Sequence, residues 1–213
     1  MSLYINTDEH VFIAGMTGSG KSYLAENYLA SYKNVVKLDT KDEVTERRKQ
    51  GKPLWGSLVE NKDFTVVTTL TEIETVTTDK IIYVPNFEEQ NLDFYNALMK
   101  WVYYRENTIL WIDELMSVAE SATKYPNYLK ALMTRGRSKN VAVWSLTQRP
   151  VDIPTICTAN STHFFVFDLM LEQDRYKMMQ VTGMPEMKDR PGKYLFWYFK
   201  NGNDKCIKAT IKR

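Results

Sequence analysis

The chain has 213 residues, of which 44% are hydrophobic and 25% are charged, so it is long enough to bury one full core. Its 28 lysine and arginine residues nearly balance 26 acidic residues, and the formal net charge is only +2. This balance argues against a free-standing nucleic-acid binder whose whole surface is basic.

The cysteine count and the lengths of the apolar runs are typical of a cytoplasmic protein. Cys157 and Cys206 are too few for a disulfide framework and lack the spacing of metal ligands. No basic stretch followed by a long apolar run opens the chain, so we expect no signal peptide. Every apolar run is far shorter than the roughly 20 residues of a membrane span. We therefore expect a cytoplasmic protein that does not span a membrane.

Short apolar runs alternate with segments of helical periodicity, a pattern typical of an α/β fold. The charged segment 42–52 has no apolar periodicity and is expected to form a surface helix or a loop. No repeat or linker divides the sequence, so we expect one domain over 1–213. The predicted strands are 11–14, 35–38, 64–68, 81–84, 108–112, 141–146, 162–167, 194–199 and 206–211, and the predicted helices are 21–32, 93–104, 128–135 and 173–181.

The segment Gly15–Ser22 matches the phosphate-loop pattern G-x-x-x-x-G-K-[ST] at every fixed position, between a predicted strand and a predicted helix. Glycines let backbone N–H groups surround phosphate oxygens, and the helix N-terminus adds partial positive charge. Lys21 would pair with the β- and γ-phosphates of ATP, and the Ser22 hydroxyl would bind Mg²⁺. The alternative is a Gly/Ser-rich turn that only begins a helix. The predicted nucleotide-binding residues are Gly15, Met16, Thr17, Gly18, Ser19, Gly20, Lys21, Ser22 and Tyr23.

Two acidic residues follow the predicted strand 108–112. In phosphate-loop enzymes the first acid after such a strand holds Mg²⁺, which assigns Asp113 to the metal. A second acid can remove a proton from the water that attacks the γ-phosphate, which assigns Glu114 as general base. The alternative is that both acids stabilise the first turn of the next helix.

The segment 134–154 contains three further candidate catalytic residues. Gln148 follows the predicted strand 141–146, where its amide could hold the attacking water or sense the γ-phosphate. Arg135 and Arg137 precede that strand, so they would reach a neighbouring subunit's nucleotide and stabilise transition-state charge in trans. The alternatives are a turn residue for Gln148 and a solvated basic turn for the arginines.

These motifs together resemble the FtsK–HerA superfamily of DNA-translocating ATPases, over about residues 11–183. The specific part is an apolar strand that ends in Thr147-Gln148-Arg149-Pro150 and is preceded by Gly136-Arg137-Ser138. The other matching features, in the order of that superfamily, are Gly15–Ser22, Asp39-x-Lys41, Asp113-Glu114, Ile153-Pro154, Phe164–Phe167, Asp174-Arg175 and Gly183.

The resemblance implies a RecA-like phosphate-loop fold of the ASCE type, with a central, mostly parallel sheet flanked by helices and late antiparallel strands. It also implies Mg²⁺-dependent ATP hydrolysis, movement of double-stranded DNA and a homo-oligomeric ring, with a hexamer favoured. In its small size the chain is most similar to the genome-packaging ATPases of tailless viruses with an internal membrane. Such a protein would act in the host cytoplasm or at a packaging vertex, with capsid or internal-membrane proteins as partners.

Three alternatives stay open. One is a cellular or plasmid DNA-transfer ATPase of the same superfamily. Another is a phosphate-loop kinase acting on a nucleotide or small molecule, and the third is a nucleotide-gated assembly factor that moves no DNA. The basic stretches do not identify a DNA-contacting loop, because a salt-bridged helix face is the better interpretation of Arg47–Lys49 and a solvated last strand is the better interpretation of the C-terminal residues. These stretches are Arg47–Lys49 with Lys52, 135–139, and Lys205, Lys208, Lys212 and Arg213.

Overall fold

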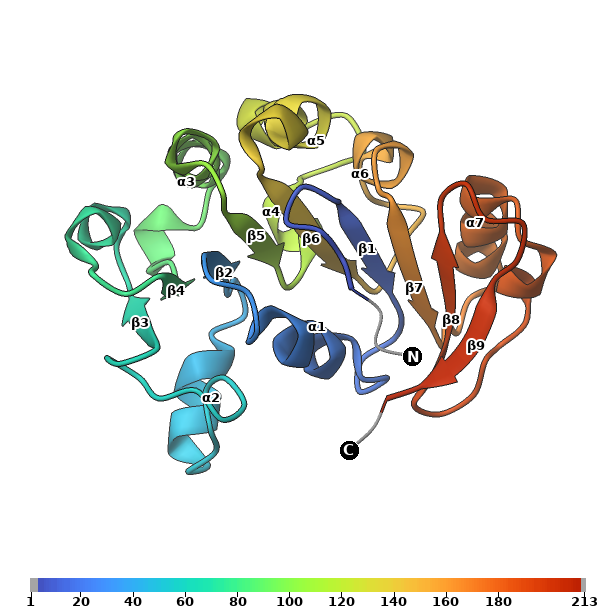
Figure 1. The fold of residues 1–213 in the computed structure, drawn as a ribbon, viewed down its shortest axis with the longest axis horizontal. Coiled ribbons are helices and arrows are strands. Elements are labelled where there is room, and N and C mark those ends of the chain that lie inside the picture. Colours follow the sequence, from blue (N-terminus) through green and yellow to red (C-terminus); the bar gives the residue numbers. More distant parts are fainter. Residues whose placement is uncertain (1–3, 212–213) are drawn as a thin grey trace.

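The computed structural model describes residues 4–211, which form a sheet of nine strands with helices on both faces (Figure 1). The strands are β1 (Val11–Ala14), β2 (Val35–Leu38), β3 (Phe64–Val67), β4 (Lys80–Tyr83), β5 (Ile109–Ile112), β6 (Ala142–Thr147), β7 (His163–Phe167), β8 (Leu195–Lys200) and β9 (Ile207–Thr210). Their order across the sheet is β3-β4-β2-β5-β6-β1-β7-β8-β9.

The first seven strands pair in parallel, whereas β8 and β9 are antiparallel additions beyond β7. The prediction of an α/β fold with a mostly parallel sheet and late antiparallel strands is therefore confirmed. The helices are α1 (Lys21–Leu29), α2 (Glu43–Lys49), α3 (Leu92–Arg105), α4 (Leu115–Val118), α5 (Asn127–Arg135), α6 (Thr155–Ala159) and α7 (Glu172–Thr182). Short 3-10 helices are η1 (Leu70–Thr75), η2 (Phe87–Glu89), η3 (Gly136–Lys139) and η4 (Pro185–Lys188).

The central strands are buried on both faces because helices cover both. Alternate residues point to opposite sides of a strand, so Val11 and Ile13 face one core while Phe12 and Ala14 face the other. The first core includes α1, and the second includes α3, α5 and α7 (Figure 1). Because both faces of these strands are buried, residues on both faces are apolar, and each strand is a continuous apolar run in the sequence.

The charged segment 42–52 contains α2, which resolves the choice between helix and loop. Asp42 precedes this helix with φ 54°, and its carboxylate accepts a hydrogen bond from the Thr45 backbone N–H at 3.4 Å. Val44 is the one α2 side chain buried in the described structure, so the segment shows no helical apolar period.

The ends of the parallel strands determine where side chains can meet. Ala14 pairs with Thr147, Ser145 with Ile112, and Ile112 with Leu38, so β1, β6, β5 and β2 end at nearly the same level. In open α/β sheets, ligands bind outside these carboxyl ends. Within residues 4–211, no helix is both long and apolar enough to cross a membrane.

Candidate functional site

The predicted phosphate loop lies between the end of β1 and the start of α1. A Cβ atom on Gly15 would lie 2.6 Å from the Phe167 Cβ and 2.7 Å from the Ser19 Oγ, so only glycine fits against β7 here. Gly20, just before α1, has φ 109°, a left-handed conformation that favours glycine. Because glycine has no side chain to cap α1, the N–H groups of the first helical turn stay available to an anion.

Two neighbouring strands fix the backbone of this loop. The Gly15 N–H donates to the Thr147 carbonyl at 3.1 Å, at the end of β6, and the Met16 N–H donates to the Asp168 carbonyl at 2.8 Å, just after β7. The Asp168 carboxylate in turn accepts two hydrogen bonds of 2.6 Å from the Arg190 guanidinium. This bidentate pair anchors the β7 end of the loop.

Lys21 is the first residue of α1, and its ammonium group lies inside the loop. The Nζ atom donates to the Gly15 carbonyl at 2.6 Å and to the Met16 carbonyl at 3.1 Å. Burial lowers the pKa of Lys21 to about 8, although Glu114 and Asp113 act in the opposite direction. Nζ thus points into the cradle that the motif predicts for phosphate.

A chain of hydrogen bonds joins the phosphate loop to Glu114, the predicted general base. The bonded residues follow the ends of β1, β6, β5 and β2. The Thr17 hydroxyl donates to the Gln148 Oε1 at 2.7 Å, and the Gln148 Nε2 donates to the Glu114 Oε2 at 3.0 Å. The Lys41 Nζ reaches the same Oε2 at 3.0 Å. Glu114 Oε1 is buried and has no hydrogen-bond partner among the described residues. One carboxylate oxygen is therefore held in place while the other is left for a ligand.

Asp113 is 2% exposed, and its Oδ1 has no hydrogen-bond partner within the described chain. An orphaned carboxylate oxygen just after β5 fits a site for Mg²⁺ and its water shell, and the predicted second ligand, Ser22, is half-buried in the first turn of α1. No group of three or more acidic, histidine or cysteine side chains among residues 4–211 could hold a metal by itself.

Glu43 adds a further negative group at this edge that the sequence reasoning missed. Burial raises the pKa of Glu43, and the nearby Asp113 and Asp39 raise it further, while Lys37 acts in the opposite direction. The Lys37 Nζ lies 3.4 Å from the Glu43 Oε2 and 4.5 Å from the centre of the Trp111 ring. Lys41 belongs to the Asp39-x-Lys41 motif, but sequence alone cannot show that β2 pairs with β5 and brings Lys41 to Glu114.

The two arginines that are predicted to act in trans, Arg135 and Arg137, lie at the amino end of β6, opposite the strand ends that carry the phosphate loop. Arg135 ends α5 and Arg137 lies in η3, both before β6 begins, and both side chains are exposed. The Arg137 Nε donates to the Asp8 carboxylate at 3.0 Å. Between them, Gly136 is held by packing, since a Cβ there would lie 2.6 Å from the Val141 carbonyl oxygen. The structure thus brings Lys21, Gln148, Asp113 and Glu114 together and separates the arginines from them.

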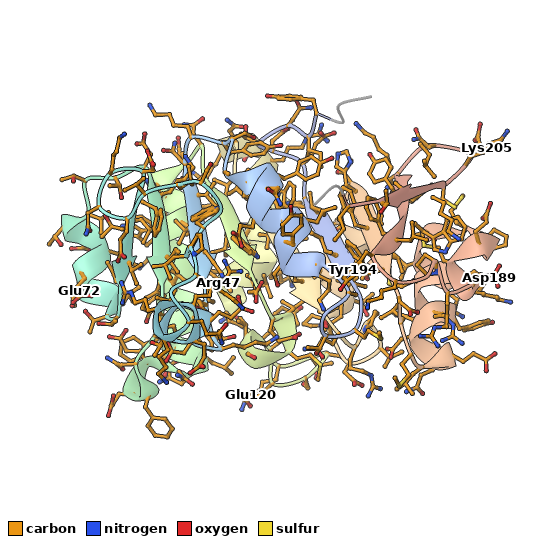
Figure 2. The ribbon with its side chains drawn as sticks, turned by 90° about the horizontal axis from the view of Figure 1, so that it is seen from below. Arg47, Glu72, Glu120, Asp189, Tyr194 and Lys205 are labelled. Carbon is orange, nitrogen blue, oxygen red and sulfur yellow. The ribbon has the colours of Figure 1, made fainter. Side chains whose placement is uncertain are left out.

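The basic stretches are mostly engaged in ion pairs. Arg47 pairs with Glu26 at 2.9 Å and Lys49 with Glu46 at 2.9 Å, while Arg48 pairs with Glu60. The prediction of a salt-bridged helix face at Arg47–Lys49 is confirmed, and Figure 2 labels Arg47 on α2. Lys205 and Lys208 are exposed near and on β9, and Lys212 and Arg213 lie outside the described residues.

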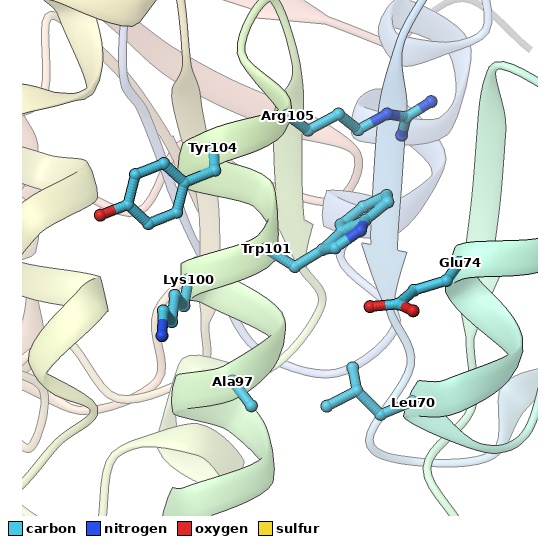
Figure 3. Close-up of a pocket in the computed structure, with 7 residues that line it drawn as sticks. All are labelled: Leu70, Glu74, Ala97, Lys100, Trp101, Tyr104 and Arg105. Atoms are coloured by element: carbon cyan, nitrogen blue, oxygen red, sulfur yellow. The ribbon is translucent and has the colours of Figure 1, made fainter.

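A groove of about 490 Å³ lies between η1 and α3, lined by Trp101, Tyr104, Arg105 and Glu74 among others (Figure 3). Its lining includes none of the predicted site residues. The phosphate loop borders a smaller cavity of about 220 Å³ that also contacts Tyr194 and Ile211.

The fold of this chain is similar to the folds of several solved structures. No family model matches the chain, and no curated protein matches it. A solved structure of the genome packaging NTPase B204 from Sulfolobus turreted icosahedral virus 2, in complex with ATP-gammaS, superposes with a TM-score of 0.77 at 17% identity, covering 98% of this chain and 100% of that one. The DNA-packaging ATPase B204 from Sulfolobus Turreted Icosahedral Virus gives a TM-score of 0.74 at 19% identity, with 98% and 100% coverage.

A cellular ATPase also shares the fold. EssC (ATPases 2 and 3) from Geobacillus thermodenitrificans superposes with a TM-score of 0.60 at 14% identity, over 91% of this chain and 38% of that one. The chain therefore has the fold of phosphate-loop ATPases of these kinds. The fold that the resemblance implies is confirmed.

Proposed function

We propose that this chain is a Mg²⁺-dependent ATPase that moves double-stranded DNA, and that it serves as the genome-packaging motor of a virus. The observation that carries the proposal is the hydrogen-bonded chain from Thr17 through Gln148 to Glu114, which links the phosphate loop to a general base. A kinase transfers the phosphoryl group to an acceptor in place of water, so it needs no base that activates water. The likeness in fold to viral packaging ATPases, over nearly the whole length of both chains, supports the same function.

The chemistry follows from where each group lies. Lys21 would exchange the Gly15 and Met16 carbonyl oxygens for β- and γ-phosphate oxygens, and the first-turn N–H groups of α1 would bind the same phosphates. Ser22 and Asp113 would hold Mg²⁺, which neutralises charge on the phosphates.

Glu114 would act on the attacking water. Its Oε2 is held by Lys41 and Gln148, so the free Oε1 is the atom that accepts the proton of the water. Gln148 bonds to both Thr17 and Glu114, so the arrival of a γ-phosphate beside the loop would be transmitted to the base through one side chain. The same contact gives the site a means of coupling nucleotide state to conformation.

We place the arginines in a neighbouring subunit's site. Because Arg135 and Arg137 lie at the sheet edge opposite the phosphate loop, they would reach a triphosphate only if another copy of the chain holds it. This geometry supports a homo-oligomeric ring, with a hexamer as our proposal. Mixing Arg137→Ala subunits with Lys21→Ala subunits should restore hydrolysis that neither variant shows alone. Absence of recovery from variants that fold and co-assemble would contradict the trans role.

DNA contact would be local and shared among the subunits of the ring. The net charge of +2 per chain allows only modest contact with phosphates in each copy. Because a ring adds the contacts of its copies, binding of duplex DNA to the assembled ring should weaken with salt. Capsid-vertex or internal-membrane proteins are the proposed further partners, and the host cytoplasm or the packaging vertex is the proposed place of action.

The test measures phosphate release with and without duplex DNA. We expect wild-type protein to release free phosphate faster when duplex DNA is added, and Glu114→Gln to bind ATP without releasing phosphate. Thr71→Ala, which changes an exposed hydroxyl on η1, is the matched control and should behave as wild type. Transfer of phosphate to an added acceptor in place of water would identify a kinase, and full turnover by Glu114→Gln would remove the assignment of the base.

A further inference from the structure

We propose that the β8–β9 hairpin holds the nucleoside end of the nucleotide, with the base packed against Tyr194 and Ile211. The inference rests on the proposed function, since it extends the ATP site from its phosphates to its base and ribose. It assigns a binding role to the antiparallel strands, which the phosphate-loop motif does not explain.

The cavity of about 220 Å³ beside the phosphate loop is formed by two parts of the chain that are far apart in sequence. Gly20 and Ser22 of the loop and Tyr23 of α1 line one side, and Tyr194 and Ile211 line the other. Figure 2 shows Tyr194 near the start of α1. A ligand bound by the loop that extends into this cavity therefore meets the ends of the hairpin.

Strand order determines in which direction a bound nucleotide extends. Glu114 and Gln148 follow β5 and β6, which lie on one side of β1, whereas β7, β8 and β9 lie on the other. The terminal phosphate must face Glu114 for hydrolysis. The opposite end of the molecule, the base and ribose, therefore points toward β7–β9 and toward the cavity.

The hairpin contacts the loop closely enough to form a defined site. A Cβ on Gly20 would lie 2.5 Å from the Ile211 Cδ1, so the Ile211 side chain covers the residue that immediately precedes α1. The Ile211 N–H donates to the Tyr194 carbonyl at 3.3 Å, which joins the start of β8 to the end of β9. Leu195 pairs with Thr210 next to this contact. Backbone pairing thus places Tyr194 and Ile211 side by side.

The chemistry of the lining suits a planar heterocycle. Tyrosine rings stack on nucleobases and isoleucine offers an apolar surface, while the tyrosine hydroxyls can bind ribose or base edges. No carboxylate or amide side chain of the described residues lines the cavity, so little would distinguish adenine from guanine. We therefore expect ATP and GTP to bind with affinities within a few-fold of each other.

The test compares a nucleotide with its phosphate portion alone. Calorimetry would measure binding of ATPγS and of inorganic tripolyphosphate, each with Mg²⁺, to wild type, Tyr194→Ala, Tyr194→Phe and Ile211→Ala. We expect wild type to bind ATPγS more tightly than tripolyphosphate. Tyr194→Ala should weaken ATPγS binding about tenfold, the scale of one lost base–aromatic stack. Ile211→Ala should also weaken ATPγS binding, through lost apolar contact, and both variants should change tripolyphosphate binding less than about twofold.

Two controls separate this proposal from the one on which it rests. Ile207→Ala changes an exposed residue of β9 outside the cavity and should bind both ligands as wild type does. Tyr194→Phe keeps the ring and should also retain ATPγS binding. Lys21→Ala should lose both ligands, and unchanged binding there would contradict the phosphate site itself.

Several results would overturn the assignment of the nucleoside site. One is equal wild-type affinity for ATPγS and tripolyphosphate, which needs no variant. Another is unchanged ATPγS affinity in both Tyr194→Ala and Ile211→Ala. An equal loss of both ligands in folded variants would show that the hairpin supports the phosphate loop and does not contact the base.

Discussion

The buried ammonium group of Lys21 makes triphosphate binding sensitive to pH. Burial lowers the pKa of Lys21 to about 8, and only the charged form can pair with phosphate. Binding of a triphosphate therefore favours the protonated form, and affinity should fall as pH rises through about 8. With that pKa, about nine in ten molecules are protonated at pH 7 and about one in ten at pH 9, so affinity should fall about tenfold, or about 1.4 kcal/mol.

Isothermal titration calorimetry with ATPγS and Mg²⁺ at pH 7 and pH 9 measures this change. Repeating the titration at pH 8 to 9 in buffers of different ionisation enthalpy detects the proton taken up on binding. Lys21→Arg is the control, because a guanidinium stays charged at both values and the variant meets the same ligand ionisation. Constant wild-type affinity from pH 7 to pH 9, together with no proton uptake, would show that triphosphate binding does not depend on protonation of Lys21 in this range.

Three further changes test other parts of the structure. Gly136→Ala places a Cβ 2.6 Å from a carbonyl oxygen and should lower the free energy of unfolding by about 1–3 kcal/mol, measured by urea denaturation. Burial lowers the pKa of His10 to about 4 from its ordinary value of 6.5, so stability should be full above pH 6.5 and fall by about 3 kcal/mol toward pH 4. His10→Gln should flatten that fall in thermal melts, and an equally steep fall would contradict the cause given. Lys41→Met removes one of the hydrogen bonds that the Glu114 Oε2 accepts, so it should lower kcat for ATP hydrolysis about tenfold with little change in KM. If Lys41 had a purely structural role, the variant would lower the melting temperature instead.

Most of the sheet could be predicted because its strands are buried on both faces. Runs such as Ile109–Ile112 have no polar positions, and each ends at a turn or an acid, so their limits are visible in sequence. The helix α2 was harder to predict because Val44 alone is buried there. Short elements such as α4 and α6 have only four or five residues, too few for a periodic pattern.

The parts of the site that follow a motif could be located in sequence, and the contacts between motifs could not. Gly15–Ser22 has a fixed spacing because backbone geometry demands it. The bonds from Lys41 and Gln148 to Glu114 depend on the strand order β2-β5-β6, which no local pattern encodes. The contact of Ile211 with Gly20 joins the two ends of the described chain and is equally invisible in sequence.

We propose that ATP hydrolysis moves this protein along duplex DNA. The most direct measurement is displacement of a labelled third strand from a DNA triplex, with ATP and Mg²⁺, by wild type and by Glu114→Gln. We predict that wild type displaces the strand only when ATP is hydrolysed, and that Glu114→Gln binds ATP and leaves the triplex intact. DNA-independent hydrolysis with no displacement by assembled wild-type protein would contradict the account.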